Sequence, residues 1–268
     1  MKNVPGAGHL IGANTVFAAR GDGLTIGTFN TGLIYNQLIR QDGARFDLAR
    51  MTWIGKAGSD PRVIAIANHS PVKNMAELKA SQTPLNFATS GIGSANYVEI
   101  TLLTNILGLP IKLLTGYNGN EDQLAMRRGE VAGGLGARSS FDGFVANGYG
   151  RFIAQIGGRE TDVPQLAPQI NEPRAKPLLD LVGAQSEIAR LTAGPPGIPA
   201  DRTEALRTAF RMAMEDPELQ AKATRLGRPV EPAYGEAVLT RVKQALDQPP
   251  ELVAALNDAM KPLEKGSK

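Results

Sequence analysis

The sequence contains no cysteine and only two histidines, and each scarcity removes a class of function. Without thiols the chain can form no disulfide bond and no thiolate metal site, and their absence suits a compartment in which free thiols would be oxidised. His9 and His69 lack an acidic or histidine partner at the spacing that a metal site on one helix requires. We therefore expect no bound metal.

Long apolar runs and an excess of one charge are also missing. No stretch approaches the roughly 18 consecutive apolar residues of a transmembrane helix. The chain has 29 basic and 26 acidic residues, spread along its length, and a formal net charge of +3. This balance indicates a solvated surface, so we expect no nucleic-acid partner. At 268 residues the chain is longer than one typical domain.

Sequence motifs of common enzymes are absent too. Ser90 lies in no G-x-S-x-G elbow and has no evident histidine base. The spacing of Gly6, Gly8 and Gly12 is G-x-G-x-x-x-G, which misses the dinucleotide fingerprint, and the chain has no P-loop lysine. We find no general base, and we predict that the protein is not an enzyme and uses no cofactor.

Short apolar runs rich in branched residues alternate with helical patterns along the first two thirds of the chain. Residues 63–67 (VIAIA), and the run 53–55 before them, are typical of buried parallel strands. Further strands are expected at 24–28, 85–88 and 111–114, and helices at 33–39, 94–107 and 121–128. Gly108 and Gly129 are expected to end the last two helices. This alternation predicts an α/β fold.

The last third of the sequence is helical in character. Asp201 with Glu204 three residues later resembles a capping box, and Asp216 before a proline is typical of a second helix start. Two more helices are expected after Tyr234 and Pro250. We expect this helical tail to pack back on the first part of the chain.

Polar loops containing glycine follow two neighbouring predicted strands. The residues concerned are Thr89, Ser90, Gly91, Gly93 and Ser94 in the first loop and Tyr117, Asn118 and Gly119 in the second. Backbone N–H groups, hydroxyls and the positive end of a helix can converge there on one carboxylate. The alternative is a structural strand-to-helix turn that needs glycine only for its geometry.

Two further segments are candidates for contact with the same ligand, in a cleft between two lobes of the α/β fold. Thr28 and Asn30 lie in an equivalent loop of the first lobe and could donate hydrogen bonds across the cleft, although a plain helix entry explains them as well. Arg138 and Ser139 follow a glycine-rich strand end, and an arginine fork would pair with a second carboxylate. A solvated surface arginine is the alternative.

Taken together, these segments resemble the substrate-binding receptors of tripartite tricarboxylate transporters, which are Bug-type periplasmic solute-binding proteins. The matching stretches occur in family order over nearly the whole chain: 3–8 (NVPGAG), 11–12 (IG), 22–25 (DGLT), 89–94 (TSGIGS), 116–119 (GYNG), 128–131 (RGEV), 195–199 (PPGIP) and 216–217 (DP). Each stretch is weak alone, and the combination is specific.

The resemblance implies a periplasmic-binding-protein type II fold, with two α/β lobes that are joined by crossover strands and close by a hinge. We expect residues 1–67 in lobe one, 68–157 in lobe two, and 158–268 back in lobe one with the helical tail. In such receptors the loop at 89–94 binds the proximal carboxylate, and residues 117–119 line the second lobe's wall. The ligand would be a small mono- or dicarboxylate, aromatic ones included, and the partners would be membrane permease subunits. We expect a periplasmic monomer.

The sequence departs from the family pattern at its start. Family members begin with a signal peptide, a first strand and a first glycine-rich binding loop, and we expect these to be missing before Met1. His9 replaces the family's second glycine after Gly-Ala-Gly. Two other interpretations stay open: a carboxylate-sensing module for a membrane signalling partner, and a truncated, non-functional receptor fragment.

Overall fold

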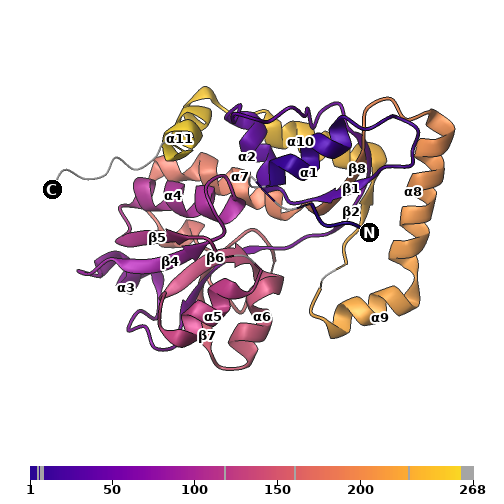
Figure 1. The fold of residues 1–268 in the computed structure, drawn as a ribbon. Helices are drawn as coiled ribbons and strands as arrows, with labels where there is room; N and C mark the ends of the chain where they lie inside the picture. Colours follow the sequence, from indigo (N-terminus) through magenta and orange to yellow (C-terminus); the bar gives the residue numbers. More distant parts are fainter. Residues whose placement is uncertain (5, 7–8, 118, 160, 229, 261–268) are drawn as a thin grey trace.

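The computed structural model describes residues 1–260 except 5, 7–8, 118, 160 and 229. Two β-sheets with helices packed around them make up the described part (Figure 1). The strands are β1 (Gly27–Phe29), β2 (Thr52–Gly58), β3 (Arg62–Ala67), β4 (Leu85–Thr89), β5 (Ile111–Thr115), β6 (Gly133–Ala137), β7 (Gly150–Ile156), β8 (Ala189–Gly194) and β9 (Ala233–Tyr234). The α-helices are α1 (Leu10–Phe17), α2 (Gly32–Leu38), α3 (Met75–Ala80), α4 (Ala95–Leu107), α5 (Glu121–Arg128), α6 (Arg138–Ala146), α7 (Lys176–Ser186), α8 (Ala200–Glu215), α9 (Pro217–Arg225), α10 (Gly235–Leu246) and α11 (Pro250–Met260). Two 3-10 turns, η2 (Ala167–Gln169) and η3 (Pro173–Ala175), precede α7.

The first sheet has the strand order β1-β8-β2-β9, and all its pairings in the described residues are antiparallel. Strand β2, one of its two inner strands, contains the buried Trp53, whose indole N–H donates to the carbonyl of Leu48 at 2.8 Å. Helices α8 and α10 pack against β2, and α1 packs against β1. The mixed α/β fold that the sequence predicts is therefore confirmed.

The second sheet has the order β5-β4-β6-β3-β7 and is mixed. Strands β5, β4 and β6 run parallel, whereas β3 is antiparallel to both β6 and β7. The prediction of parallel strands at 53–55 and 63–67 is therefore wrong. An apolar run predicts that both faces of a strand are buried. It does not predict strand direction, because a strand can be buried in this way beside parallel or antiparallel neighbours.

The change from one sheet to the other falls between β2 and β3. The expected limit of lobe one, residue 67, lies after β3, yet β3 belongs to the second sheet. Helix α7, expected with lobe one, packs against β3 and β7 of the second sheet as well as against α10. We therefore call the first sheet with its helices lobe one, and the second sheet with α3 to α7 lobe two.

Two apolar clusters form the core. The smaller one joins β3, β4, α5 and α6 on one face of the second sheet and contains Met126, Phe141 and Phe144. The larger one runs without a break from Trp53 of the first sheet to the other face of the second sheet, at Phe87. Helices α2, α10 and α11 of lobe one meet α4 and α7 of lobe two there (Figure 1). The lobes thus share a core on one side.

Several helix ends follow the local sequence signals. Gly108 and Gly129 end α4 and α5 with φ of 62° and 80°, a left-handed conformation that favours glycine. The Asp216 carboxylate accepts a hydrogen bond from the Leu219 N–H at 2.8 Å and caps α9. The capping box predicted at Asp201 is not formed, because the residue before the first helical residue of α8 is Pro199, two positions before Asp201, and α8 has no side-chain cap.

Helices α8 and α9 form an arm that extends from the first sheet toward lobe two (Figure 1). Neither helix contains a buried residue. Across the described residues, no helix combines the length and apolar character that crossing a bilayer requires. The same residues contain no group of three or more His, Cys, Asp or Glu side chains that could hold a metal ion.

Candidate ligand-binding cleft

A cleft of about 260 Å³ lies where the chain crosses between the two sheets. Its floor is formed by two connections that run side by side, because the Asp60 N–H donates to the Ser186 carbonyl at 2.8 Å. Lobe one contributes the end of β1 with the residues that follow it and the start of β8, and lobe two contributes β3 and the turn from β6 into α6. The cleft therefore touches both lobes and both crossing segments.

Two side chains in this cleft carry buried polar atoms without a hydrogen-bond partner among the described residues. Gln185, at the end of α7, is 2% exposed, and neither its Nε2 nor its Oε1 is paired. Arg190, on β8, donates through Nη2 to Asp60 at 2.8 Å, while its buried Nη1 has no partner. Because more than nine in ten buried polar groups are normally paired, these atoms make the cleft a candidate site for a polar ligand that would supply the missing partners.

Arg62 lines the same cleft from β3 and is fixed by a buried carboxylate. Its Nε and Nη2 donate to Oε2 of Glu99 at 2.9 and 2.5 Å. The Tyr35 hydroxyl donates to the other oxygen of Glu99 at 3.1 Å. Burial raises the pKa of Glu99, and Arg62 and Tyr35 oppose that rise. Since Tyr35 lies in α2 and Glu99 in α4, this group also ties the two lobes together.

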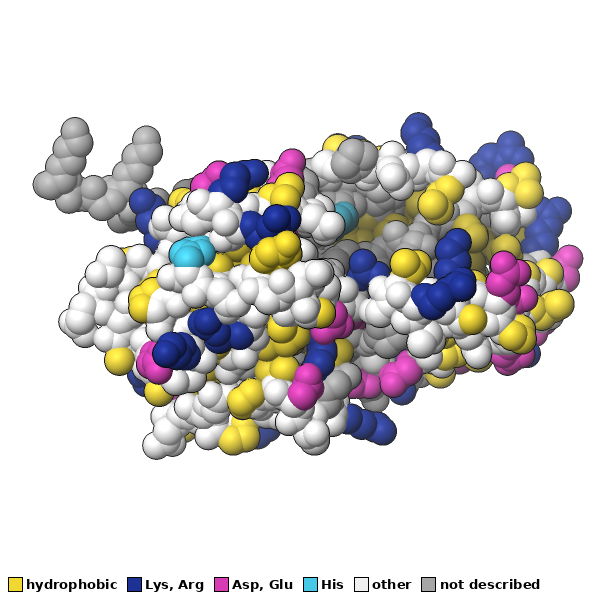
Figure 2. Space-filling model, turned by 90° about the horizontal axis from the view of Figure 1, so that it is seen from below, with side chains coloured by type: hydrophobic (Ala, Val, Ile, Leu, Met, Phe, Trp, Pro, Cys, Tyr) yellow, Lys and Arg dark blue, Asp and Glu magenta, His cyan; other side chains and the backbone are white. Residues whose placement is uncertain are grey.

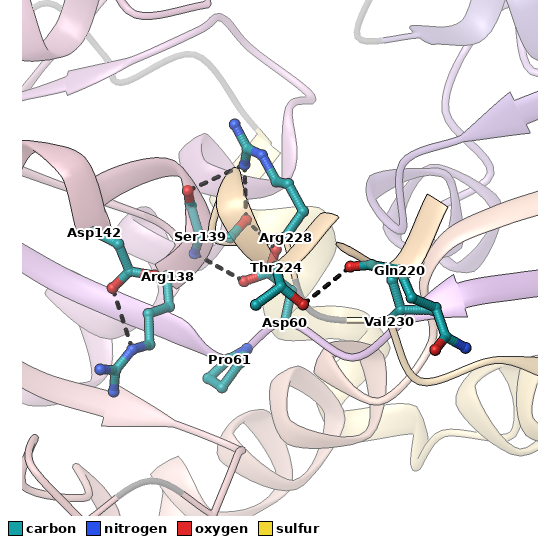
Figure 3. A pocket seen from close by; sticks show the side chains of 10 residues that line it. Asp60, Pro61, Arg138, Ser139, Asp142, Gln220, Thr224, Arg228 and Val230 are labelled. Atoms are coloured by element: carbon teal, nitrogen blue, oxygen red, sulfur yellow. Dashed lines mark hydrogen bonds and ion pairs between the residues drawn. The ribbon is translucent and has the colours of Figure 1, made fainter. Parts of the chain in front are cut away.

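A second cavity of about 530 Å³ adjoins the cleft on the other side of Asp60, between α6 and the end of α9 (Figure 3). Ser139 is its centre: the backbone N–H and hydroxyl of Ser139 donate to Asp60 at 3.0 and 2.6 Å. Arg190 and Arg228 both donate to the Ser139 hydroxyl at 2.9 Å, and Arg228 also donates to the Ser139 carbonyl at 3.0 Å. Arg228 follows α9, so this contact fastens the arm to lobe two.

The predicted site residues fall into separate groups. Thr28 and Asn30 line the cleft, the Thr28 hydroxyl lying 3.2 Å from that of Thr192 and the Asn30 side chain accepting from the Gly32 N–H at 2.8 Å. Arg138 and Ser139 line the second cavity. Arg138 donates twice to Asp162, at 2.8 and 2.6 Å, and contacts Asp142 at 3.3 Å. A ligand carboxylate would have to compete with those aspartates for Arg138.

The loop at 89–94 lies at the contact between the lobes and lines neither of these two cavities. Thr89 and Ser94 are buried, while Ser90 is exposed. Gly91 has open space where a side chain would be, whereas a Cβ on Gly93 would lie 3.0 Å from the Gln41 amide of lobe one. The predicted helix start at Ser94 is confirmed. Its hydroxyl, however, donates to the Gly91 carbonyl instead of capping the helix.

The second predicted loop lies away from both cavities. Tyr117 packs at the edge of the smaller apolar cluster, and its N–H donates to the Thr89 carbonyl at 3.2 Å. Gly119 is exposed, with φ of 57°. The third residue of this prediction, Asn118, lies outside the described residues. This loop adjoins the loop at 89–94, but neither reaches the Arg190 side of the cleft.

Sequence reasoning missed Gln185, Arg190 and Arg62. A single glutamine inside a helix and single arginines at strand ends have no motif or spacing that would set them apart. Of the three, Arg190 has an unusual backbone conformation, with a φ of 58° in a residue other than glycine, and no sequence pattern predicts it. Only the meeting of α7, β8 and β3 brings these side chains together.

Solved structures of binding proteins share this fold. The periplasmic binding protein BugD superposes with a TM-score of 0.74 at 21% identity, covering 95% of this chain and 84% of that one. MatC from Rhodopseudomonas palustris with bound malate gives 0.73 at 19%, covering 96% and 85%. An R. palustris protein solved with adipate gives 0.70 at 15%, covering 93% and 82%. The fold is therefore that of a two-lobed solute-binding protein.

The sequence itself identifies the family. Residues 1–258 match the family model described as "Tripartite tricarboxylate transporter family receptor", and the chain belongs to that family. No curated protein matches the chain. The family comprises solute-binding receptors and not enzymes, in agreement with the absence of enzyme motifs from the sequence.

Proposed function

We propose that the protein is an extracytoplasmic receptor that captures a small carboxylate and delivers it to the membrane permease of a tripartite tricarboxylate-type transporter. Membership of the receptor family supports this role. The observation that carries it is the cleft at the crossing of the two lobes, where Arg190 and Gln185 present buried, unpaired polar atoms. A guanidinium with a free N–H is a strong donor to a carboxylate.

The arrangement of the cleft explains how binding would favour a closed form. A carboxylate at Arg190 would contact a strand of lobe one beside Asp60, which in turn holds Ser139 of lobe two. A ligand that touches both lobes binds the closed form more tightly and shifts the population toward it. The loop at 89–94, with its helix start, remains our candidate for a second contact to the ligand.

Two structural relatives support a carboxylate as the cargo, since one was solved with malate and another with adipate. The periplasm is the compartment that the family and the BugD likeness support. The permease partner follows from the family description, in which the receptor serves a transporter. We expect the receptor to act as a monomer, because each chain has its own cleft.

Thermal unfolding with organic acids of four to eight carbons tests this function. A bound acid stabilises the fold by mass action, by about 2.7 kcal/mol at a hundredfold excess over Kd, which raises Tm by several degrees. We expect at least one acid to produce such a shift, and Arg190→Met to abolish it. Arg174→Met, a change at an exposed arginine outside the cleft, should keep it. No shift with any acid would contradict the proposal.

A further inference from the structure

We propose that the receptor prefers a short dicarboxylate that bears a hydroxyl group, with Arg190 binding one carboxylate and Gln185 recognising the hydroxyl beside it. This inference rests on the proposed function and narrows its ligand. It follows from three properties of the cleft: its size, the placement of the Arg190 guanidinium, and the unpaired donor and acceptor atoms of the Gln185 side chain.

The cleft is small and polar. Its volume of about 260 Å³ is below the roughly 300 Å³ at which pockets for drug-sized molecules begin. Phe29 is the one aromatic side chain among its described lining residues, whereas Thr28, Asn30 and Ser140 contribute hydroxyl and amide groups. A flat aromatic acid would cover these polar groups without pairing them, so the lining favours a short aliphatic acid.

Arg190 is placed in the cleft at a conformational cost. Its φ of 58° lies in the left-handed region, which is costly for a residue with a side chain, and such backbone is often kept where a side chain must be aimed. One edge of its guanidinium is held by Asp60 and Ser139 through Nη2. The buried Nη1 has no hydrogen-bond partner among the described residues, while the contacts of Nη2 orient the guanidinium before a ligand arrives. A carboxylate is the matching acceptor.

Gln185 distinguishes among acids because its side chain needs both a donor and an acceptor from the ligand. Its Nε2 can donate to a carboxylate oxygen, but its Oε1 can only accept. An unsubstituted dicarboxylate such as succinate has no proton to donate at neutral pH and would leave Oε1 unpaired at a buried position. A hydroxyl next to the carboxylate pairs Oε1 while the carboxylate pairs Nε2. An amino group could also donate, but it would add a cation beside Arg190 and Arg62.

Calorimetric titration of the full chain with malate, succinate and aspartate tests the inference. We expect malate to bind roughly tenfold or more tightly than succinate, because one unpaired buried polar atom has about that effect, and more tightly than aspartate. Gln185→Met keeps the length of the side chain and removes its polar atoms. In this variant we expect the affinity for malate to fall by about the same factor. The affinity for succinate should change less than about twofold, because the lost Nε2 contact is offset by removal of the unpaired Oε1, and the preference should disappear.

Each other outcome has a defined meaning. Equal affinities for malate and succinate in the wild type, or an equal loss of both in Gln185→Met, would overturn the role of Gln185. Tighter binding of aspartate than of malate would overturn the choice of a hydroxyl. If other carboxylic acids bind but none of these three does, the inference fails and the receptor function stands. If no carboxylic acid binds, the proposed function itself fails. An unchanged urea midpoint of Gln185→Met without ligand shows that the variant is folded.

Discussion

At the scale of single residues, the buried carboxylate of Glu99 sets a pH dependence. Its side chain is 1% exposed and is paired with Arg62 and Tyr35. Burial raises its pKa above the ordinary value because the charged form loses its hydration, and the partners only partly offset this effect. The folded state therefore binds a proton more tightly at Glu99 than the unfolded state does. Glu99 thus contributes stability at low pH, and this contribution is lost as the pH rises through its raised pKa.

Glu99→Gln isolates that contribution. We expect the difference in unfolding free energy, wild type minus variant, to decrease as the pH rises from about 4 to about 7, because only the wild type loses stability through this group. Urea unfolding at several pH values measures the difference. Glu130→Gln is the control: its difference in unfolding free energy should change with pH in the opposite direction, since the hydrogen bond from Arg128 lowers the pKa of Glu130. A pH-independent difference for Glu99→Gln would contradict the assignment.

Residue-scale function is only partly predictable from the sequence. The sequence predicts that Thr28 and Asn30 lie in a loop that faces a cleft. Both line the cleft, but Thr28 lies in strand β1 and only Asn30 in the loop after it, and a ligand contact of either residue stays a prediction. Nothing in the sequence predicts Gln185 and Arg190. Their proposed role rests on burial without hydrogen-bond partners at the meeting of α7 and β8, and neither the type nor the spacing of these residues predicts that.

At the scale of secondary-structure elements, local sequence signals predict the ends of helices better than they predict which strands pair and in which direction. The glycines at 108 and 129 end their helices as predicted, because a left-handed residue is a local requirement. Strand direction is not predictable in this way, since β2 pairs with β8 from residues that lie more than 130 positions later in the sequence. The missing capping box at α8 has a local reason: Pro199, and not Asp201, precedes the first helical residue.

Helix α9 offers an element-scale test of capping. Its N-terminal cap is the Asp216 carboxylate, and its face contributes no buried residue that would compensate for the loss of that cap. Asp216→Ala should destabilise the start of α9 by about 1 kcal/mol and accelerate amide hydrogen exchange there roughly fivefold. Asp201→Ala is the matched control, because the Asp201 side chain does not cap α8. Equal acceleration in both variants would refute capping by Asp216.

At the scale of the whole molecule, the two sides of the lobe junction differ. On one side the lobes share the larger apolar cluster, through α2 and α10 of lobe one and α4 and α7 of lobe two. On the other side, seen from below, the surface is hollowed between lobe two and the arm of α8 and α9 (Figure 2). There Arg228, which follows the arm, makes polar contacts with the carbonyl and hydroxyl of Ser139 in lobe two. We therefore expect any opening of the lobes to disturb less buried apolar surface on the arm side, with the shared core as the hinge side.

Because the chain has no cysteine, this motion can be measured with two introduced labels. We choose Ala146→Cys on α6 and Lys222→Cys on α9, both exposed and on opposite sides of the hollow. If ligand binding closes the lobes, saturating acid should raise energy transfer between dyes at these positions by shortening their separation. The same measurement with Arg228→Ala should show lower transfer without ligand, since the arm loses its contact with Ser139.

A second labelled pair separates hinge motion from other causes. Ala146→Cys and Lys79→Cys both lie in lobe two, on α6 and α3, so their separation should stay constant when ligand is added. A change in both pairs would indicate an effect on the dyes or on lobe two itself. Constant transfer in both pairs, under conditions where calorimetry shows saturation, would mean that the receptor binds without closing. The shared apolar core would then hold the lobes in one arrangement, and the permease would have to recognise the bound ligand by a route other than lobe closure.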